Sequence, residues 1–108
     1  MKKIEAVIPP SRLDAVRLEL ERRGIWGKLT LTEVRQWDTN PPSIRTEGES
    51  AGPFQHRIKV ELLVSDRQAD KIINFILRYA PTDSPEDHGH VTLLDVCQVL
   101  QIAQPWQN

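Results

Sequence analysis

Three stretches of the chain alternate apolar and polar residues with the two-residue period of a β-strand. They are 2–8 (KKIEAVI), 29–37 (LTLTEVRQW) and 56–64 (HRIKVELLV). The alternation is clearest in the third, where one face would hold Ile58, Val60 and Leu62 and the other Arg57, Lys59 and Glu61. A fourth, shorter stretch, 91–96 (VTLLDV), has strand-like composition. The pattern predicts four strands.

Two segments between these strands carry apolar residues at helical spacing. The first is predicted to begin at Ser11, as the N-cap, and to end at Gly24 in a left-handed conformation. The second is predicted to begin with the capping pair Ser65 and Gln68 and to end at Pro81. Its expected buried stripe consists of Ala69, Ile72, Ile73, Ile76, Leu77 and Ala80.

The order of elements is therefore βαββαβ, in two right-handed crossover units. This order predicts an α+β fold of the ferredoxin-like type, with an antiparallel sheet and two helices on one face. The other face of the sheet would be bare, and a chain of 108 residues offers nothing else to cover it. We therefore expect a homo-oligomer.

Two polar segments interrupt this pattern. Residues 38–55 contain three prolines and two glycines, so we predict a long loop over about 37–55 that serves as an interaction arm, with a disordered insertion as the alternative. Trp37 and Phe54 flank this loop and would contact a partner or simply pack at its base. Arg45 near its tip would bind a carboxylate or an anion, or simply be solvated.

The second loop, about 82–90 (TDSPEDHGH), concentrates acidic and imidazole side chains: Glu86, Asp87, His88 and His90. A metal site is conceivable there, but the spacing matches no strong metal signature, and such clusters are usually solvated. We predict no metal site. A ferredoxin-like trimer that handles a divalent metal remains the alternative.

The overall composition narrows the function further. A chain of 108 residues with 14 basic and 15 acidic side chains fits one domain and gives no reason to expect nucleic-acid binding. Cys97 is the single cysteine, and the chain has neither a secretory signal pattern nor an apolar run long enough for a membrane span. We expect a cytoplasmic protein without direct membrane insertion. No nucleophile motif or glycine-rich phosphate cradle supports an enzyme.

Three segments carry a family resemblance: the opening MKKIEAVIPPSRLDAVRLELERRGIWG, the strand LTEV, and HRIKVELLVSD before the second helix. They resemble the PII family of signalling proteins, over residues 1–96 apart from the long loop. The resemblance implies a single-domain homotrimer whose three inter-subunit clefts each bind an adenine nucleotide. It also implies that loop 37–55 docks on a protein partner, which would be a membrane transporter or an enzyme.

The resemblance further implies roles for individual residues of the nucleotide cleft. Thr30 and Leu63 would lie near the base, Glu61 near the ribose and Arg57 near the phosphates, and Val7 belongs to the same expected site. In the loop 82–90 the family commonly has Thr-Gly-x-x-Gly-Asp-Gly-Lys. Here Gly89 is retained, His88 stands in place of Asp, and His90 stands in place of Lys as a titratable phosphate contact.

Other positions depart from the family pattern and change the expected ligand. The arginine pair that follows the last strand in the family is absent from QIAQPWQN, so AMP or ADP is favoured over ATP. The only tyrosine is Tyr79, in the second helix rather than in the loop. Divergent branches of the superfamily sense bicarbonate in inorganic carbon uptake and carboxysomes, and by analogy this chain would bind bicarbonate too. A trimeric scaffold without a ligand is the rival hypothesis.

Overall fold

The structure, a computed structural model, describes residues 1–25, 29–37, 54–82 and 89–103. Its elements follow the predicted order along the chain. They are β1 (Lys2–Ile8), the 3₁₀ turn η1 (Pro10–Arg12), α1 (Leu13–Arg22), β2 (Leu29–Trp37), β3 (Phe54–Val64), α2 (Asp66–Tyr79) and β4 (His90–Asp95).

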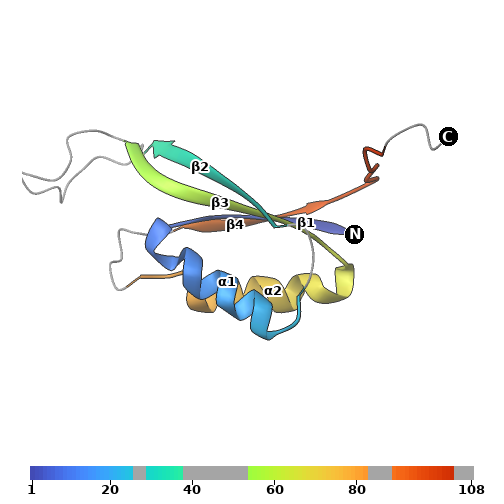
Figure 1. Ribbon diagram of the computed structural model, residues 1–108, viewed down its shortest axis with the longest axis horizontal. Helices are drawn as coiled ribbons and strands as arrows, with labels where there is room; N and C mark the ends of the chain where they lie inside the picture. The colour runs from blue at the N-terminus through green and yellow to red at the C-terminus, as the bar shows by residue number, and fades with distance from the viewer. Residues whose placement is uncertain (26–28, 38–53, 83–88, 104–108) are drawn as a thin grey trace, which may run out of the picture.

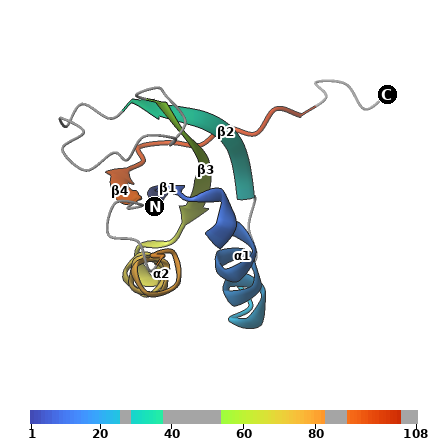
Figure 2. The same cartoon turned by 90° about the vertical axis from the view of Figure 1, so that its left-hand side faces the viewer.

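The four strands form one sheet in the order β2-β3-β1-β4, and every neighbouring pair is antiparallel. Both helices lie on the same side of this sheet (Figures 1 and 2). The predicted α+β, ferredoxin-like βαββαβ fold is therefore confirmed. The side of the sheet opposite the helices is called the open face below.

The hydrophobic core fills the space between the sheet and the two helices. Strand residues of one parity face this space, because side chains alternate along a strand. The buried core residues of the sheet are Ile4, Ala6 and Ile8 of β1 and Val60, Leu62 and Val64 of β3. The helices contribute Val16 and Leu20 from α1 and Ala69, Ile72, Phe75 and Ile76 from α2.

One residue of the predicted α2 stripe does not join the core. Leu77 is 58% exposed, whereas Ile76 beside it is 0% exposed. The α-helix advances by about 100° per residue, and this turn carries Leu77 out of the arc that Ile72, Phe75 and Ile76 direct at the core. Leu77 lies at the edge of the apolar stripe, and the prediction that it is buried was wrong.

The predicted C-terminal end of α1 is confirmed, whereas the predicted N-cap is wrong. Gly24 has φ 65°, the left-handed conformation predicted for it. The N–H of Ile25 donates to the carbonyl of Leu20 (3.0 Å) and that of Gly24 to the carbonyl of Glu21 (3.0 Å), the Schellman pattern. Ser11, in contrast, is not the N-cap, because Pro10 starts the turn η1 and α1 begins only after it.

Helix α2 is fixed at both ends by contacts with other residues. The hydroxyl of Ser65 accepts a hydrogen bond from the backbone N–H of Gln68 at 3.3 Å, as the capping pair predicts. At the other end, Arg12 donates from Nε (2.9 Å) and Nη2 (2.6 Å) to the carbonyl oxygen of Tyr79. A cation at the C-terminus of a helix satisfies a free carbonyl and compensates the helix dipole.

The strands that follow the two loops begin earlier than predicted. β3 begins at Phe54 rather than His56, because its register with β2 continues to the pair Trp37 and Phe54. The rings of these two residues are 4.7 Å apart at 82°. β4 covers His90–Asp95 rather than 91–96. Arg45 and His88 lie outside the described residues.

Candidate ligand-binding face

The sheet register gathers the predicted nucleotide-binding residues on the open face. Glu61 pairs with Thr30 on one side and Glu5 on the other, and Lys59 pairs with Val7. His90 pairs with Val7 from β4. The candidates on this face are Val7, Thr30, Arg57, Glu61, Leu63 and His90, by the alternation of strand faces. Residues predicted from four separate sequence segments are thus brought onto one surface.

The centre of the open face carries a ladder of alternating charges. Lys3 Nζ lies 2.9 Å from Glu61 Oε2 and 3.1 Å from Glu5 Oε1. Lys59 Nζ lies 3.3 Å from the other oxygen of Glu61. Hydrogen bonds from Lys3 and then Lys59 lower the pKa of Glu61, and the bonds to Glu61 and Glu5 raise the pKa of Lys3. Glu61 is therefore ionised at neutral pH and keeps lone pairs that can accept further hydrogen bonds.

Arg57 is the most buried cation of the face, with 5% of its surface exposed. Its Nη1 donates to the backbone carbonyl of His56 (3.1 Å) and its Nη2 to the side-chain oxygen of Gln55 (2.5 Å). The guanidinium therefore extends toward the beginning of β3, where loop 37–55 ends. A ligand that contacts Arg57 would act next to the base of this loop.

Gly89 lies against the backbone of β1. A Cβ atom built on Gly89 would overlap with the carbonyl oxygen of Val7. Only glycine permits this close approach, so packing alone accounts for the glycine that the resemblance assigned to phosphate binding. Its ligand role stays a prediction.

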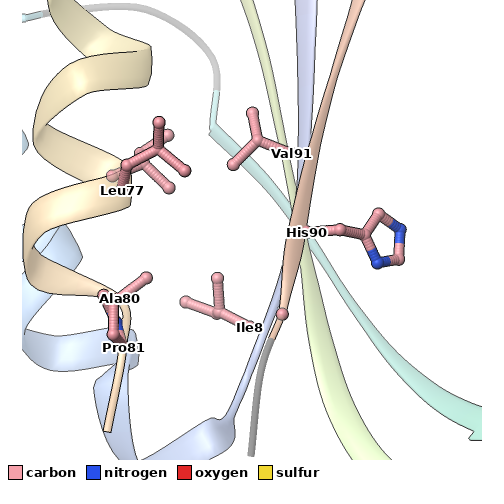
Figure 3. Close-up of a pocket in the computed structure, with 8 residues that line it drawn as sticks. Ile8, Leu77, Ala80, Pro81, His90 and Val91 are labelled. Carbon is pink, nitrogen blue, oxygen red and sulfur yellow. The ribbon is translucent and has the colours of Figure 1, made fainter. Parts of the chain in front are cut away.

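His90 and Val91 project to opposite sides of β4. In Figure 3 the imidazole of His90 points away from α2, toward the open face, whereas Val91 points toward Leu77 and Ile8. The imidazole is therefore on the same side of the sheet as Arg57 and Glu61.

A concave feature that was not predicted lies on the helix side of the sheet. A cavity of about 200 Å³ separates the C-terminal end of α2 from the start of β4 (Figure 3). Its lining comprises Ile8, Ile76, Leu77, Ala80, Pro81, Gly89, His90 and Val91. We call it the α2–β4 pocket. The apolar residue at the edge of the helical stripe, Leu77, was the only sequence signal for it.

The remaining predictions concern metals and membranes. Within the described ranges, no three His, Cys, Asp or Glu side chains are grouped so that they could hold a metal ion. The cluster 86–88 falls outside those ranges. Neither helix among the described residues has the length and apolar character needed to cross a bilayer.

Comparisons with known proteins identify the family. The family described as Nitrogen regulatory protein P-II matches residues 1–104. The Nitrogen regulatory protein P-II of Pasteurella multocida is 36% identical over 110 residues, covering 100% of this chain and 96% of that protein. The protein of the same name from Nostoc punctiforme gives the same figures. Nitrogen regulatory protein P-II 1 of Escherichia coli K12 is 35% identical over 104 residues, covering 94% of this chain and 91% of its own length.

Proteins of this family are regulatory signal transducers that form trimers and interact with proteins and small molecules. The predicted homotrimer is consistent with that pattern. The resemblance stated from the sequence is confirmed over nearly the whole length of the chain. This chain belongs to the P-II family.

Proposed function

We propose that this protein is a cytoplasmic homotrimeric regulator that binds AMP or ADP in clefts between subunits. The observation that carries the proposal is the common location of Val7, Thr30, Arg57, Glu61, Leu63 and His90 on the open face. This face offers apolar, anionic and cationic side chains in neighbouring register positions. A nucleotide needs these three kinds of contact, for its base, its ribose hydroxyls and its phosphates.

The balance of charges favours a nucleotide with few phosphates. Arg57, Lys59 and Lys3 supply cations on the open face, but the ammonium groups of Lys3 and Lys59 are both paired with the Glu61 carboxylate that lies between them. An ionised Glu61 accepts hydrogen bonds from ribose hydroxyls and repels phosphate oxygens. Residues 96–108 contain no charged side chain that could reach additional phosphates. ATP would therefore gain little over ADP.

The proposed signal passes from Arg57 to loop 37–55 and then to a membrane transporter or an enzyme. Arg57 contacts Gln55, which is adjacent to Phe54 and its edge-to-face partner Trp37. These aromatic side chains are about half exposed, at 49% and 54%. A ligand that draws Arg57 toward its phosphates alters the support of the loop, and it shifts the loop's conformations to the extent that it binds one of them better.

Isothermal titration calorimetry with AMP, ADP and ATP tests the proposal. We expect micromolar binding of AMP or ADP, weakened at least about tenfold in Arg57→Ala, which loses a charge-assisted hydrogen bond to phosphate. Lys71→Ala is the matched control, because Lys71 is an exposed cation on α2, on the other side of the sheet. Silent titrations, with melting curves unchanged by nucleotide, would leave a trimeric scaffold as the function.

Bicarbonate is the second effector that we propose to test, with inorganic carbon acquisition as the process served. The support is the altered loop 82–90, where imidazoles replace two of the charged side chains of the family pattern. The relatives named above are nitrogen regulatory proteins, so nucleotide titrations should be run with and without bicarbonate and with 2-oxoglutarate. Stronger ADP binding in bicarbonate alone would support the carbon-linked role, whereas an effect of 2-oxoglutarate alone would support nitrogen control.

A further inference from the structure

Arg12 joins two parts of the fold that border the predicted phosphate contacts. It belongs to η1, and its Nε (2.9 Å) and Nη2 (2.6 Å) donate to the carbonyl oxygen of Tyr79 at the end of α2. Both donors therefore act on a single acceptor. After Tyr79, only Ala80 and Pro81 precede loop 82–90. Arg12 thus holds the point from which this loop departs.

The other end of the same loop is held by the end of β1. Gly89 lies so close to the carbonyl oxygen of Val7 that a Cβ atom would overlap with it, and His90 pairs with Val7 in the sheet. Only Pro9 separates the end of β1 from the start of η1, the turn that contains Arg12. One short stretch of chain, from Val7 to Arg12, therefore contacts the residues that flank loop 82–90 on both sides.

Side-chain packing leaves a gap beside the end of α2. The α2–β4 pocket, of about 200 Å³, separates Ala80 and Pro81 from Val91 at the start of β4 (Figure 3). Pro81 has no backbone N–H that could donate back to the carbonyls of the last helical turn. Because a tightly filled interior resists displacement and a cavity does not, the position of this helix end depends on its remaining contacts. The two hydrogen bonds from Arg12 are such contacts.

We propose that Arg12 is a positioning residue for the phosphates of the bound nucleotide. By fixing the end of α2 against the end of β1, it sets the span that loop 82–90 must bridge before it returns to His90. The inference rests on the nucleotide-binding role of the proposed function. A residue that contacts a ligand keeps its geometry only when the structure behind it is fixed.

Arg12 acts through the backbone and does not touch the phosphates itself. Its guanidinium is directed to the carbonyl of Tyr79, on the helix side of the sheet. The imidazole of His90 points to the opposite side, toward the open face (Figure 3). Replacement of Arg12 should therefore affect only the part of the ligand that loop 82–90 contacts.

Titrations of the full-length chain with ADP and with adenosine test this inference, because adenosine has the base and the ribose but no phosphate. Arg12→Ala should weaken ADP binding at least about tenfold, the effect of losing one hydrogen bond to a charged group. It should leave the affinity for adenosine within about twofold. An equal loss of affinity for both ligands would overturn the positioning role, because it would show a general disturbance of the cleft.

Arg78→Ala is the matched control for the loss of a positive charge at this helix end. Arg78 is an exposed residue next to Tyr79, and its guanidinium lies 5.8 Å from the centre of the Tyr79 ring. The substitution removes the same charge but leaves both hydrogen bonds from Arg12 in place. We expect it to leave the ratio of the ADP and adenosine affinities unchanged. A change as large as that in Arg12→Ala would assign the effect to charge and overturn the inference.

Arg12→Lys tests the contact itself. Because both donors of Arg12 reach one oxygen, the ammonium of a lysine can replace them at the carbonyl of Tyr79. This variant should bind ADP within about threefold of the unaltered protein. ADP binding as weak as in Arg12→Ala would contradict the inference, since the helix end would again have a donor.

The same titrations separate this inference from the proposed function. Partial unfolding of Arg12→Ala, which circular dichroism measures, lowers both affinities alike and so leaves their ratio interpretable. An unaltered protein that binds ADP, together with an Arg12→Ala variant that binds it equally well, retains the proposed function and refutes the positioning role. An unaltered protein that binds no nucleotide refutes both.

Discussion

Glu5 and Glu61 face each other in register across the β1–β3 pair, and the ammonium of Lys3 bridges their carboxylates. Two like charges directly opposite on a sheet repel each other. Lys3, at 3.1 Å and 2.9 Å from the two carboxylates, converts this repulsion into attraction. Lys3 therefore allows the two carboxylates to lie opposite each other on the open face.

These ion pairs predict a pH dependence for Glu61→Gln. The pKa of Glu61 is lowered below its usual value of 4.5 by the hydrogen bonds from Lys3 and Lys59. Its ion pairs therefore stabilise the native state fully above that value and are lost as the pH falls through the native-state pKa. Urea unfolding should show the variant less stable than the unaltered protein at about pH 7, with the difference shrinking as the pH falls below the usual pKa of a glutamate. Glu33→Gln, an exposed position on β2, is the control and should show no such convergence.

Arg12 is predicted to stabilise the end of α2. Arg12→Ala removes two hydrogen bonds from the guanidinium to the carbonyl of Tyr79 and should lower the free energy of unfolding by about 1–3 kcal/mol. Arg67→Ala, an exposed arginine in the first turn of the same helix, should change it by less than about 0.5 kcal/mol. Equal effects of both substitutions in chemical denaturation would mean that the contact contributes nothing specific.

Gly89→Ala should disturb both stability and ligand binding. The added Cβ would overlap with the carbonyl of Val7, so the start of β4 must move away from β1 and carry His90 with it. Gly24→Ala is the matched control, because its φ of 65° makes the substitution cost about 1–2 kcal/mol without touching the open face. ADP binding that survives Gly89→Ala and Gly24→Ala equally well would exclude a role for this part of β4.

The contrast between neighbouring positions of α2 gives a prediction about packing. Ile72 is 0% exposed, and Ile72→Ala should lower the free energy of unfolding by about 2–5 kcal/mol, because the substitution leaves a cavity in the core. Leu77 is 58% exposed, and Leu77→Ala should lower the free energy of unfolding by less than about 1 kcal/mol. Thermal or urea denaturation measures both. A large loss of stability in Leu77→Ala would show that this side chain is covered.

The fold could be predicted from the sequence because local patterns determine it. The alternation in 56–64 separated Ile58, Val60 and Leu62 from Arg57, Lys59 and Glu61, as the two faces of β3 do. Gly24 and Ser65 marked helix ends that the structure confirms. Ser11 was misassigned because Pro10 begins a 3₁₀ turn before the helix. The apolar periodicity of a segment shows that a helix forms there, but it does not show whether a 3₁₀ turn precedes the first α-helical residue.

The site was less predictable because it depends on register. No local pattern states that Lys59 lies opposite Val7, or that Lys3 bridges Glu5 and Glu61, since these pairs join segments far apart in the chain. Gly89 was noticed for its family position, but its steric reason required the backbone of β1. The α2–β4 pocket needed the relative placement of a helix and a strand, and the sequence offered only Leu77 as a sign of it.

The position of β1 has a consequence for how the chain folds. This first strand lies inside the sheet, where Ile4 pairs with Leu62 on one side and with Leu93 on the other. A growing chain cannot complete either pairing until most of its length has been synthesised. Contacts between residues so distant in sequence slow folding, because the loop-closure entropy is lost before the pairing compensates it. The amino-terminal segment made first should therefore be among the last to acquire protection from hydrogen exchange.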